Sequence, residues 1–175
     1  LSQPSNASKQ SFVTPAPRQE TEAFLSTLKR IIEEHQIDLL IPTCEEVFHI
    51  AKGLGSLPCR VFAEPLEKLD VFHNKWSFAN SAKECGLPDT LLIADQDGLS
   101  DVFARWKRVV LKPIYSRFAS RTLVLPALRE ALSALTFDRT WIAEKFVEGR
   151  QFCSYSVCQE GRVVAHSVYP AIFTA

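Results

Sequence analysis

Apolar residues recur at spacings of three and four between residues 21 and 35, in the run TEAFLSTLKRIIEEH. This period predicts an amphipathic helix over 21–35, with Thr21 as its N-cap. The next apolar run, residues 37–41, is continuous instead of periodic, and Pro42 ends it. A continuous run of this length predicts a buried strand of a parallel sheet.

The pattern then repeats in shorter form. Residues 43–46, TCEE, predict a capping box, in which a Thr hydroxyl and a Glu carboxylate satisfy the first amides of a helix that runs to about Leu54. Residues 60–63 predict another short strand. This order of helices and strands is typical of a parallel α/β unit. We interpret residues 21–69 as the C-terminal part of an α/β domain and residues 1–20 as a flexible lead-in.

Residues 70–140 carry a different alternation, which we interpret as one compact α+β lobe. Its first helix is expected over 74–85, with Gly86 as the C-terminal stop. The remaining strands are expected at 90–94, 108–113 and 122–125, and the remaining helices at 99–106 and 128–135.

Residues 141–175 are interpreted as a third segment, made of strands. WIAEK at 141–145 predicts the first of them, and the Glu148-Gly149 pair that follows predicts a turn. Two alternating strands are expected after this turn, one from Phe152 and one over 163–169.

The composition fits a packed interior. Hydrophobic residues make up 46% of the chain and charged residues 23%, which is typical of a globular protein. The 20 basic and 20 acidic residues cancel, so no overall field favours nucleic acid or an anionic membrane. The apolar runs are far shorter than the roughly 20 residues of a membrane helix. We therefore expect no nucleic-acid partner and no membrane span.

The five cysteines are scattered without a CxxC pair. Their odd number and spacing predict neither a disulfide framework nor a zinc site. We therefore expect a reducing, cytoplasmic location and thiols that are buried as small apolar groups. The four histidines show no metal-binding spacing either, so no metal ligand is predicted within this chain.

Two lysines lie where predicted elements end or begin. Lys112 stands between Leu111 and Pro113 at a strand end, where a side chain can leave the sheet and contact phosphate oxygens. Lys75 opens the helix predicted over 74–85, near amides that favour anions. From the residues alone, the alternative for each is a solvated surface lysine.

The stretch WIAEKFVEGRQFCSYS at 141–156, together with VVLKP at 109–113, resembles the ATP-grasp superfamily, in particular its carbamoyl-phosphate synthase and biotin carboxylase branch. LDVFHNKWSFANSAKECGLPDT at 69–90 is similar to the lysine-bearing helix of that family. The resemblance covers about residues 37–170. It implies an α/β fold of the ATP-grasp type, with the end of a parallel pre-ATP-grasp domain at 21–69, the small ATP-binding lobe at 70–140 and the start of the large antiparallel-sheet lobe at 141–175.

The resemblance implies phosphate roles for both lysines. It also places residues 115–121, YSRFASR, where the family carries a mobile glycine-rich loop over the phosphates. This chain has no glycine there, and a backbone approaches phosphate closely only where side chains permit. Ser116, Arg117 and Arg121 are the expected substitutes, through charge-assisted hydrogen bonds. The alternative is a polar hairpin turn.

Residues 144–147 match the family's adenine-recognition connector. The resemblance implies that the Glu144 carboxylate and the backbone of Lys145 and Val147 contact the base. Seven residues past Glu144, where family members often place a Glu on the ribose hydroxyls, this chain has Gln151, which can still accept and donate hydrogen bonds. The alternative for this stretch is a charged hairpin.

The resemblance also implies a reaction. ATP phosphorylates a carboxylate to an acylphosphate, and an amine or similar nucleophile then displaces the phosphate. The implied ligands are ATP or ADP, a small carboxylate, an amine and Mg²⁺, with the metal ligands expected outside this chain; a homodimer is among the implied assemblies. Two alternatives stay open, a nucleotide-binding module without catalysis and an interaction domain that binds no nucleotide.

Overall fold

The computed structural model describes residues 8–117 and 119–171. The chain divides into two compact units, residues 1–73 (unit 1) and residues 74–175 (unit 2). Each unit has its own hydrophobic core. The finer division into four segments that the sequence suggests stays a prediction.

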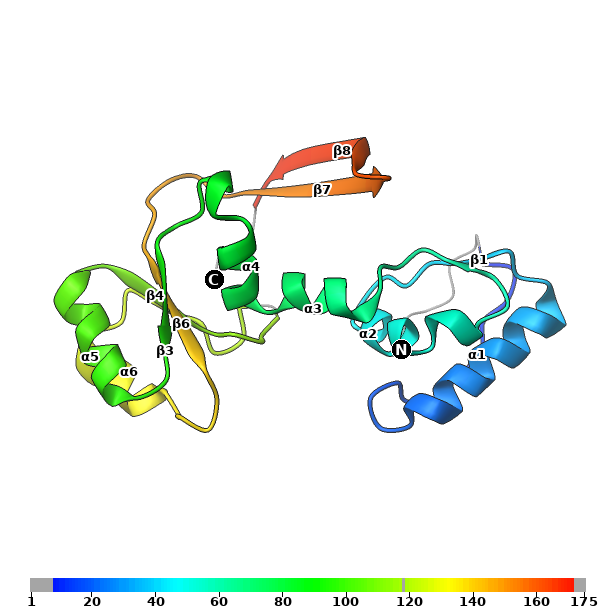
Figure 1. Cartoon of the computed structure of the whole chain (residues 1–175), viewed down its shortest axis with the longest axis horizontal. Coiled ribbons are helices and arrows are strands. Elements are labelled where there is room, and N and C mark those ends of the chain that lie inside the picture. The colour runs from blue at the N-terminus through cyan, green and yellow to red at the C-terminus, as the bar shows by residue number, and fades with distance from the viewer. Residues whose placement is uncertain (1–7, 118, 172–175) are drawn as a thin grey trace. The chain divides into compact units, whose positions relative to one another are not determined.

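Unit 1 alternates helices with short strands, as the apolar pattern predicts (Figure 1). Its elements are α1 (Thr21–His35), β1 (Leu39–Leu40), α2 (Glu46–Lys52), a 3₁₀ turn (Leu54–Ser56), β2 (Arg60–Val61) and α3 (Leu66–His73). Strands β1 and β2 are parallel, with Leu39 opposite Arg60. The predicted helix over 21–35 and the parallel pairing are therefore confirmed.

The core of unit 1 is built by the apolar stripe of α1. Phe24, Leu25 and Ile32 pack with Ile50 of α2 and with Leu57 beyond it. Leu25 and Phe24 lie seven and eight residues before Ile32, about two helical turns, so the three share one face of α1. Leu40 of β1 and Val61 of β2 are only partly buried and pack against this cluster.

The strand predicted over 37–41 is shorter and more exposed than expected. Only Leu39–Leu40 pairs, and the side chains of Leu39 and Ile41 are 42% and 56% exposed. A parallel strand is buried throughout when both faces of its sheet are covered and strands flank it. Strand β1 has one neighbour in a two-stranded sheet. The expectation of a buried strand is therefore wrong.

Two predicted helix caps differ in outcome. Thr21 is the first residue of α1 and not its cap, because its hydroxyl donates to the Pro17 carbonyl at 2.7 Å. Glu46 does reach back as predicted, accepting from the amides of Thr43 and Cys44 at 2.8 and 3.0 Å. Partial burial raises the pKa of Glu46, but these backbone amides outweigh it and hold the pKa below its ordinary value. Since α2 begins only at Glu46, the Thr half of the capping box is wrong.

Unit 2 is organised around a four-stranded antiparallel sheet. Its elements are α4 (Lys75–Ser81), a 3₁₀ turn (Lys83–Cys85), β3 (Thr90–Ile93), α5 (Gln96–Arg105), β4 (Val109–Pro113), β5 (Leu123–Val124), α6 (Leu128–Ala134), β6 (Trp141–Lys145), β7 (Phe152–Gln159) and β8 (Arg162–Pro170). The strand order of the sheet is β3-β6-β4-β5, so β6 lies between two strands that precede it in the chain. Gly86, at φ +71°, ends the turn after α4 as predicted.

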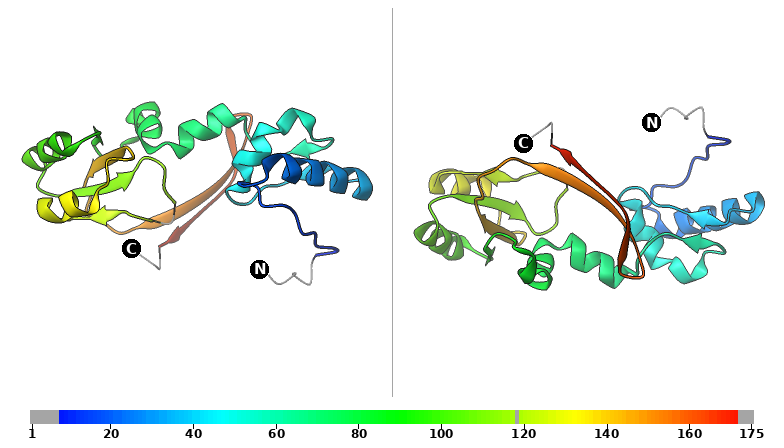
Figure 2. Two further views of the ribbon diagram at one scale, coloured as in Figure 1. Left: turned by 90° about the horizontal axis from the view of Figure 1, so that it is seen from below. Right: turned by 90° about the horizontal axis from the view of Figure 1, so that it is seen from above.

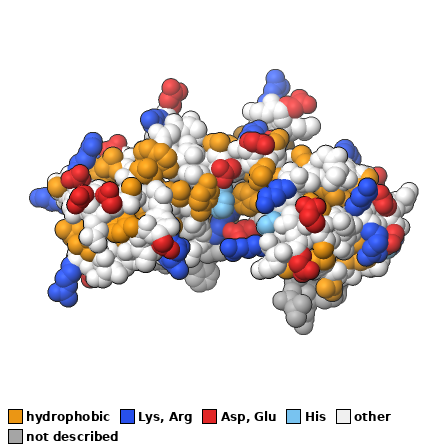
Figure 3. All heavy atoms as spheres, turned by 60° about the horizontal axis from the view of Figure 1, so that its bottom comes forward, with side chains coloured by type: hydrophobic (Ala, Val, Ile, Leu, Met, Phe, Trp, Pro, Cys, Tyr) orange, Lys and Arg blue, Asp and Glu red, His pale blue; other side chains and the backbone are white. Residues whose placement is uncertain are grey.

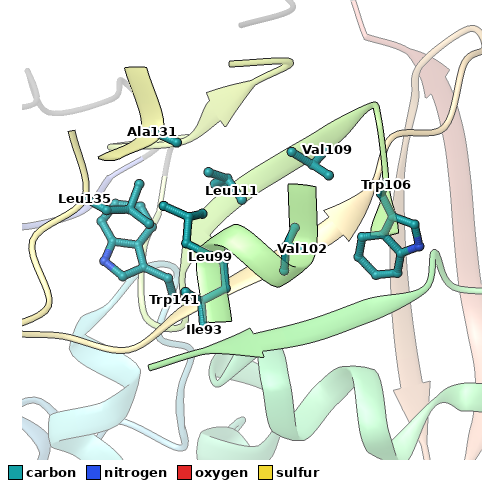
Figure 4. Packing of buried hydrophobic residues seen from close by; sticks show 10 residues of the cluster. Ile93, Leu99, Val102, Trp106, Val109, Leu111, Ala131, Leu135 and Trp141 are labelled. Carbon is teal, nitrogen blue, oxygen red and sulfur yellow. The ribbon is translucent and has the colours of Figure 1, made fainter. Parts of the chain in front are cut away.

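One face of this sheet carries the core of unit 2. Leu111 of β4 and Trp141 of β6 point towards α5 and α6, where they meet Leu99 and Ala131 (Figure 4). Figure 1 shows both helices on this side of the sheet. Because side chains alternate along a strand, the residues between these core positions point to the opposite face. That opposite face holds the candidate site.

Strands β7 and β8 form a long two-stranded ribbon, which can be followed in both views of Figure 2. Nearly all of its side chains are exposed, including Tyr155 at 67% and Val163 at 60%. This exposure explains one wrong expectation, because Cys153 and Cys158 lie on the ribbon and are exposed. Cys44 and Cys85 are exposed as well, and Cys59 is half-buried.

The surface agrees with the balanced composition. On the face shown in Figure 3, acidic and basic side chains are interspersed, in keeping with 20 of each in the sequence. Within the described ranges, no helix combines the length and the apolar character that crossing a membrane requires.

Candidate functional site

An open cavity of about 490 Å³ lies in unit 2 on the sheet face opposite α5 and α6. Its lining comes from α4, the segment before β3, β4, β5, the end of β6 and the loops that follow β4 and β6. The lining residues are Lys75, Pro88, Val110, Lys112, Ser116, Ala119, Thr122, Val124, Glu144, Lys145, Phe146, Val147 and Gln151. This volume lies within the range of small-molecule sites, roughly 300 to 1,000 Å³.

The cavity brings together most of the predicted site. Of the nine predicted residues, all of which the structure describes, seven line it: Lys75, Lys112, Ser116, Glu144, Lys145, Val147 and Gln151. Arg117 and Arg121 do not belong to the lining. This grouping shows where the residues lie; their contacts with a nucleotide stay predictions.

Strand alternation places Lys112 and Glu144 on the cavity face. In the register of β4 and β6, Val110 lies opposite Glu144 and Lys112 lies opposite Ile142, so Lys112 and Glu144 are diagonal neighbours. The Lys112 Nζ donates to Glu144 Oε2 at 2.5 Å, with the two side chains 28% and 22% exposed. A half-buried, charge-assisted hydrogen bond therefore links the two residues that the sequence assigns to phosphate and to base.

Lys75 enters the cavity from the first turn of α4. Asn74 caps this helix, its side chain accepting from the Ser77 amide at 3.0 Å. The Lys75 Nζ donates to both the carbonyl and the hydroxyl of Ser116, each at 2.9 Å. The ammonium is therefore held beside the loop that follows β4.

The charge environment couples Lys75 to the ion pair. Burial lowers the pKa of Lys75 below its ordinary value of 10.5, and the positive charges of Lys112 and Arg117 lower it further, while Glu144 opposes the shift. The lining holds three lysines and one carboxylate, so the cavity carries net positive charge before Arg117 is counted. An anion entering it relieves the repulsion between the cations.

The loop at 115–121 adopts backbone conformations that usually need glycine. Ala119 and Arg121 have φ values of +53° and +61°, in the left-handed region where side chains are disfavoured. The side chain of Arg121 lines a separate cavity of about 320 Å³ that includes Trp141. Arg117 stays outside the lining but close enough to affect Lys75, and Phe118 lies outside the described residues. Of the three residues predicted to take the place of the glycines, only Ser116 lines the cavity.

The connector after β6, residues 145–147, also lines the cavity. The Lys145 amide donates to the Asp89 carbonyl at 2.9 Å, and the Phe146 amide donates to the Arg108 carbonyl at 3.0 Å. These bonds anchor the connector to neighbouring segments. Because the Lys145 amide already donates to Asp89, the base contact predicted for this residue would be made by its carbonyl. The contact predicted for Val147 would be made by its own backbone.

Sequence reasoning missed the apolar part of the lining. Val110, Thr122, Val124 and Phe146 contribute walls to the cavity, and Ala119 part of its rim. Val110 could have been found, because it lies two residues before Lys112 on the same strand and alternation puts both on one face. The residues of β5 depend on long-range strand pairing, which the local pattern does not contain.

A second cavity in unit 2, of about 320 Å³, contains none of the predicted residues. Trp76, Lys83, Arg105 and Trp106 are among its lining residues. It lies beside β3, away from Lys112 and Glu144, which line the larger cavity.

The described residues do not fit a magnesium site. Among residues 8–117 and 119–171, no three His, Cys, Asp or Glu side chains are grouped so that they could hold a metal ion. Glu144 is a single carboxylate, and Lys112 is already bound to it. Mg²⁺ prefers an octahedral set of oxygen ligands, so the cavity as described suits an anion better than a metal.

Comparison with known proteins supports the fold. No protein-family model matches the sequence, and no curated protein matches it significantly. Solved structures do match. Carboxyaminoimidazole ribonucleotide synthase from Aspergillus clavatus, solved with ATP, is 19% identical with a TM-score of 0.63, over 93% of this chain and 42% of that one.

Two further structures agree. D-alanyl-alanine synthetase A from Vibrio cholerae is 13% identical with a TM-score of 0.62, over 79% of this chain and 47% of that one. The biotin carboxylase domain of the Hydrogenobacter thermophilus 2-oxoglutarate carboxylase, in complex with MgADP, ADP and bicarbonate, is 13% identical with a TM-score of 0.59, over 77% of this chain and 34% of that one.

These three proteins share the ATP-grasp fold. The chain therefore has the ATP-grasp fold, and the α/β fold class predicted from its sequence is confirmed. It spans between 34% and 47% of the length of the three structures. A likeness to carbamoyl-phosphate synthase in particular stays a prediction.

Proposed function

We propose that this chain carries the nucleotide half of the active site of an ATP-grasp ligase. The observation that supports the proposal most directly is the convergence of Lys75, Lys112 and Glu144 in one cavity of about 490 Å³. Two cations suit the phosphates, and a carboxylate in the same cavity suits an exocyclic amine. The ligand would be ATP or ADP.

In the proposed complex, Lys75 and Lys112 bind the phosphate oxygens, with Ser116 beside them. Glu144 and the Lys145 carbonyl accept from the adenine amine, Val147 contacts the base through its backbone, and Gln151 bonds the ribose. Lys112 already donates to Glu144, and an ammonium has three N–H donors. It can therefore keep this bond while it contacts a phosphate oxygen.

The proposed reaction is the formation of an acylphosphate. The carboxylate oxygen of an acid substrate attacks the terminal phosphorus of ATP, the bond to the bridging oxygen breaks and ADP leaves. An amine or similar nucleophile then attacks the acyl carbon and releases inorganic phosphate. The residues in this cavity would bind and orient the nucleotide and stabilise the charge that develops on its phosphates. Mg²⁺, the acid and the amine belong to the proposal for the whole protein, as do a homodimer and a cytoplasmic location.

A second candidate function is nucleotide binding without catalysis. It is favoured by the loop at 115–121, which has no glycine to bring its backbone close to phosphate. In this case ATP would bind as a structural or regulatory ligand. Hydrolysis or transfer by the full-length protein separates the two candidates.

The test is calorimetric titration with ATP and with ADP. We expect saturable binding by the native chain and at least a tenfold loss of affinity for Lys112→Met, or about 1.4 kcal/mol. Lys107→Met is the matched control, because Lys107 is exposed and does not line the cavity. Binding that both variants retain equally, or a folded chain that binds neither nucleotide, contradicts the proposal.

A further inference from the structure

One amide side chain joins two segments of the cavity that are 41 residues apart. Asn74 Oδ1 accepts from the Ser77 amide at 3.0 Å and so caps α4. Its Nδ2 donates to the Tyr115 hydroxyl at 3.0 Å. Beside it, the Lys75 amide donates to the Ile114 carbonyl at 3.1 Å. The start of α4 is therefore tied to the segment after β4 through a backbone bond and a side-chain bond.

These ties determine where the Lys75 ammonium lies. Lys75 directly follows Asn74, and both acceptors of its Nζ belong to Ser116, the residue after Tyr115. An ammonium has three N–H donors. Two are directed to Ser116, so tetrahedral geometry sets the direction of the third. Both Lys75 and Ser116 line the cavity.

Holding a lysine in this way favours binding. A free lysine side chain carries about 2 kcal/mol of rotamer entropy, part of which is lost when it binds a ligand. When protein contacts restrict the side chain beforehand, less rotamer entropy is lost as the ligand binds. Neither Asn74 nor Tyr115 is in the cavity lining, but each directly precedes a residue that is, Lys75 and Ser116.

We propose that Asn74 and Tyr115 are positioning residues that orient Lys75 towards the phosphates of the nucleotide. The inference rests on the proposed function, and it makes a narrower claim. The two residues act on the triphosphate end of the ligand and leave the base end unaffected. Losing either one lowers the affinity for ATP and not the affinity for adenosine.

Two single substitutions separate this role from helix capping. Asn74→Ser keeps an efficient N-cap but is too short to reach Tyr115, and Tyr115→Phe removes only the hydroxyl. Tyr155→Phe is the matched control, because Tyr155 lies on the exposed ribbon. Native chain, variants and the double variant are titrated with ATP and with adenosine, and their melting temperatures are recorded.

We expect ATP affinity to fall about threefold to tenfold in both single variants, the net worth of one hydrogen bond. The double variant should be no weaker than Asn74→Ser alone, because both changes remove the same bond. Adenosine affinity, melting temperature and the Tyr155→Phe control should not change.

Three results overturn the inference. Unchanged ATP affinity in Tyr115→Phe shows that the bond positions nothing, and tighter ATP binding shows that Ser116 competes with phosphate for Lys75. An equal loss for ATP and adenosine shows general loosening instead of positioning. The proposed function fails in a different way, when the native chain itself binds neither ligand. If Asn74→Ser melts early, Tyr115→Phe alone decides.

Discussion

The two faces of the four-stranded sheet in unit 2 are made by the same strands but differ in the burial and the charge of their side chains. On the helix-covered face, Val109, Leu111 and Trp141 are at most 2% exposed. On the other face, Lys112 and Glu144 keep 28% and 22% of their side-chain exposure and bind each other. Leu111 and Lys112 are neighbours in sequence, yet one belongs to the core and the other to the cavity.

The difference shows how a small lobe separates stability from binding. Alternation along a strand sends successive side chains to opposite faces. Apolar burial on one face stabilises the sheet without involving the cavity, and charged side chains on the other face remain available to a ligand. A substitution on one face should therefore leave the property of the other face largely intact.

The largest expected effect is on the core face. Leu111→Ala removes a side chain with 0% exposure and leaves a cavity among α5, α6 and β6. We expect unfolding free energy to fall by about 3 kcal/mol, within the usual range of roughly 2 to 5. Urea denaturation followed by circular dichroism measures it. Leu125→Ala is the control, since Leu125 is 43% exposed; equal losses in both variants contradict the division between faces.

The next effect is on base recognition at the cavity face. Glu144→Gln keeps the size of the side chain and removes its charge. We expect the preference for ATP over inosine triphosphate, which has an oxo group in place of the amine, to fall about tenfold, because the charge-assisted bond is lost and an amide can donate to the oxo group. Competition titrations with both nucleotides measure this ratio. A preference that survives in a variant with native melting behaviour shows that Glu144 does not contact the base.

A smaller effect is expected on stability when a residue of the cavity face is replaced. Lys112→Met breaks the ion pair with Glu144, but both side chains are partly exposed, and Lys75 remains close enough to Glu144 for their charges to interact. We expect unfolding free energy to change by about 1 kcal/mol or less, against the larger loss for neighbouring Leu111→Ala. Paired urea titrations test this. If Lys112→Met proves as damaging as Leu111→Ala, the cavity face is also structural.

The smallest expected effect is the uptake of a fraction of a proton by Lys75 when ATP binds. Burial, Lys112 and Arg117 lower the pKa of Lys75 below 10.5 in the folded chain. Between the lowered value and 10.5, the unfolded state binds more protons than the folded state, so this group makes stability rise with pH across that window. A bound polyphosphate favours the charged lysine and raises its pKa again.

ATP binding at about pH 9.5, close to the ordinary range of lysine, should therefore take up less than one proton. Calorimetry in buffers of different ionisation enthalpy measures the uptake. Lys75→Met should abolish this uptake. Equal uptake with and without Lys75 assigns the proton to another group.

Local patterns predicted most of the elements, and the resemblance to the ATP-grasp superfamily pointed to most of the seven predicted residues that line the cavity. The helix over 21–35 follows from a period of about 3.6 residues, and the strand predicted over 108–113 from a short apolar run; both signals depend only on neighbours in sequence. The exposure of residues 39 and 41 could not be predicted in this way, because burial depends on how many elements cover a strand. The exposure of the Cys153 and Cys158 thiols on β7 could not be predicted for the same reason.

The sequence by itself determined which residues face the same way and which chemical groups this chain offers. The local pattern placed Lys112 at a strand end, and the resemblance of the 141–147 stretch to the ATP-grasp superfamily pointed to Glu144 and its connector. Only the tertiary structure decided which of these groups meet. Inserting β6 between β3 and β4 brings Glu144 to Lys112 across 32 residues of chain, and the tie at Asn74 brings Lys75 to Ser116. Such contacts depend on strand register and loop closure, which arise from packing of the whole unit and not from any local period.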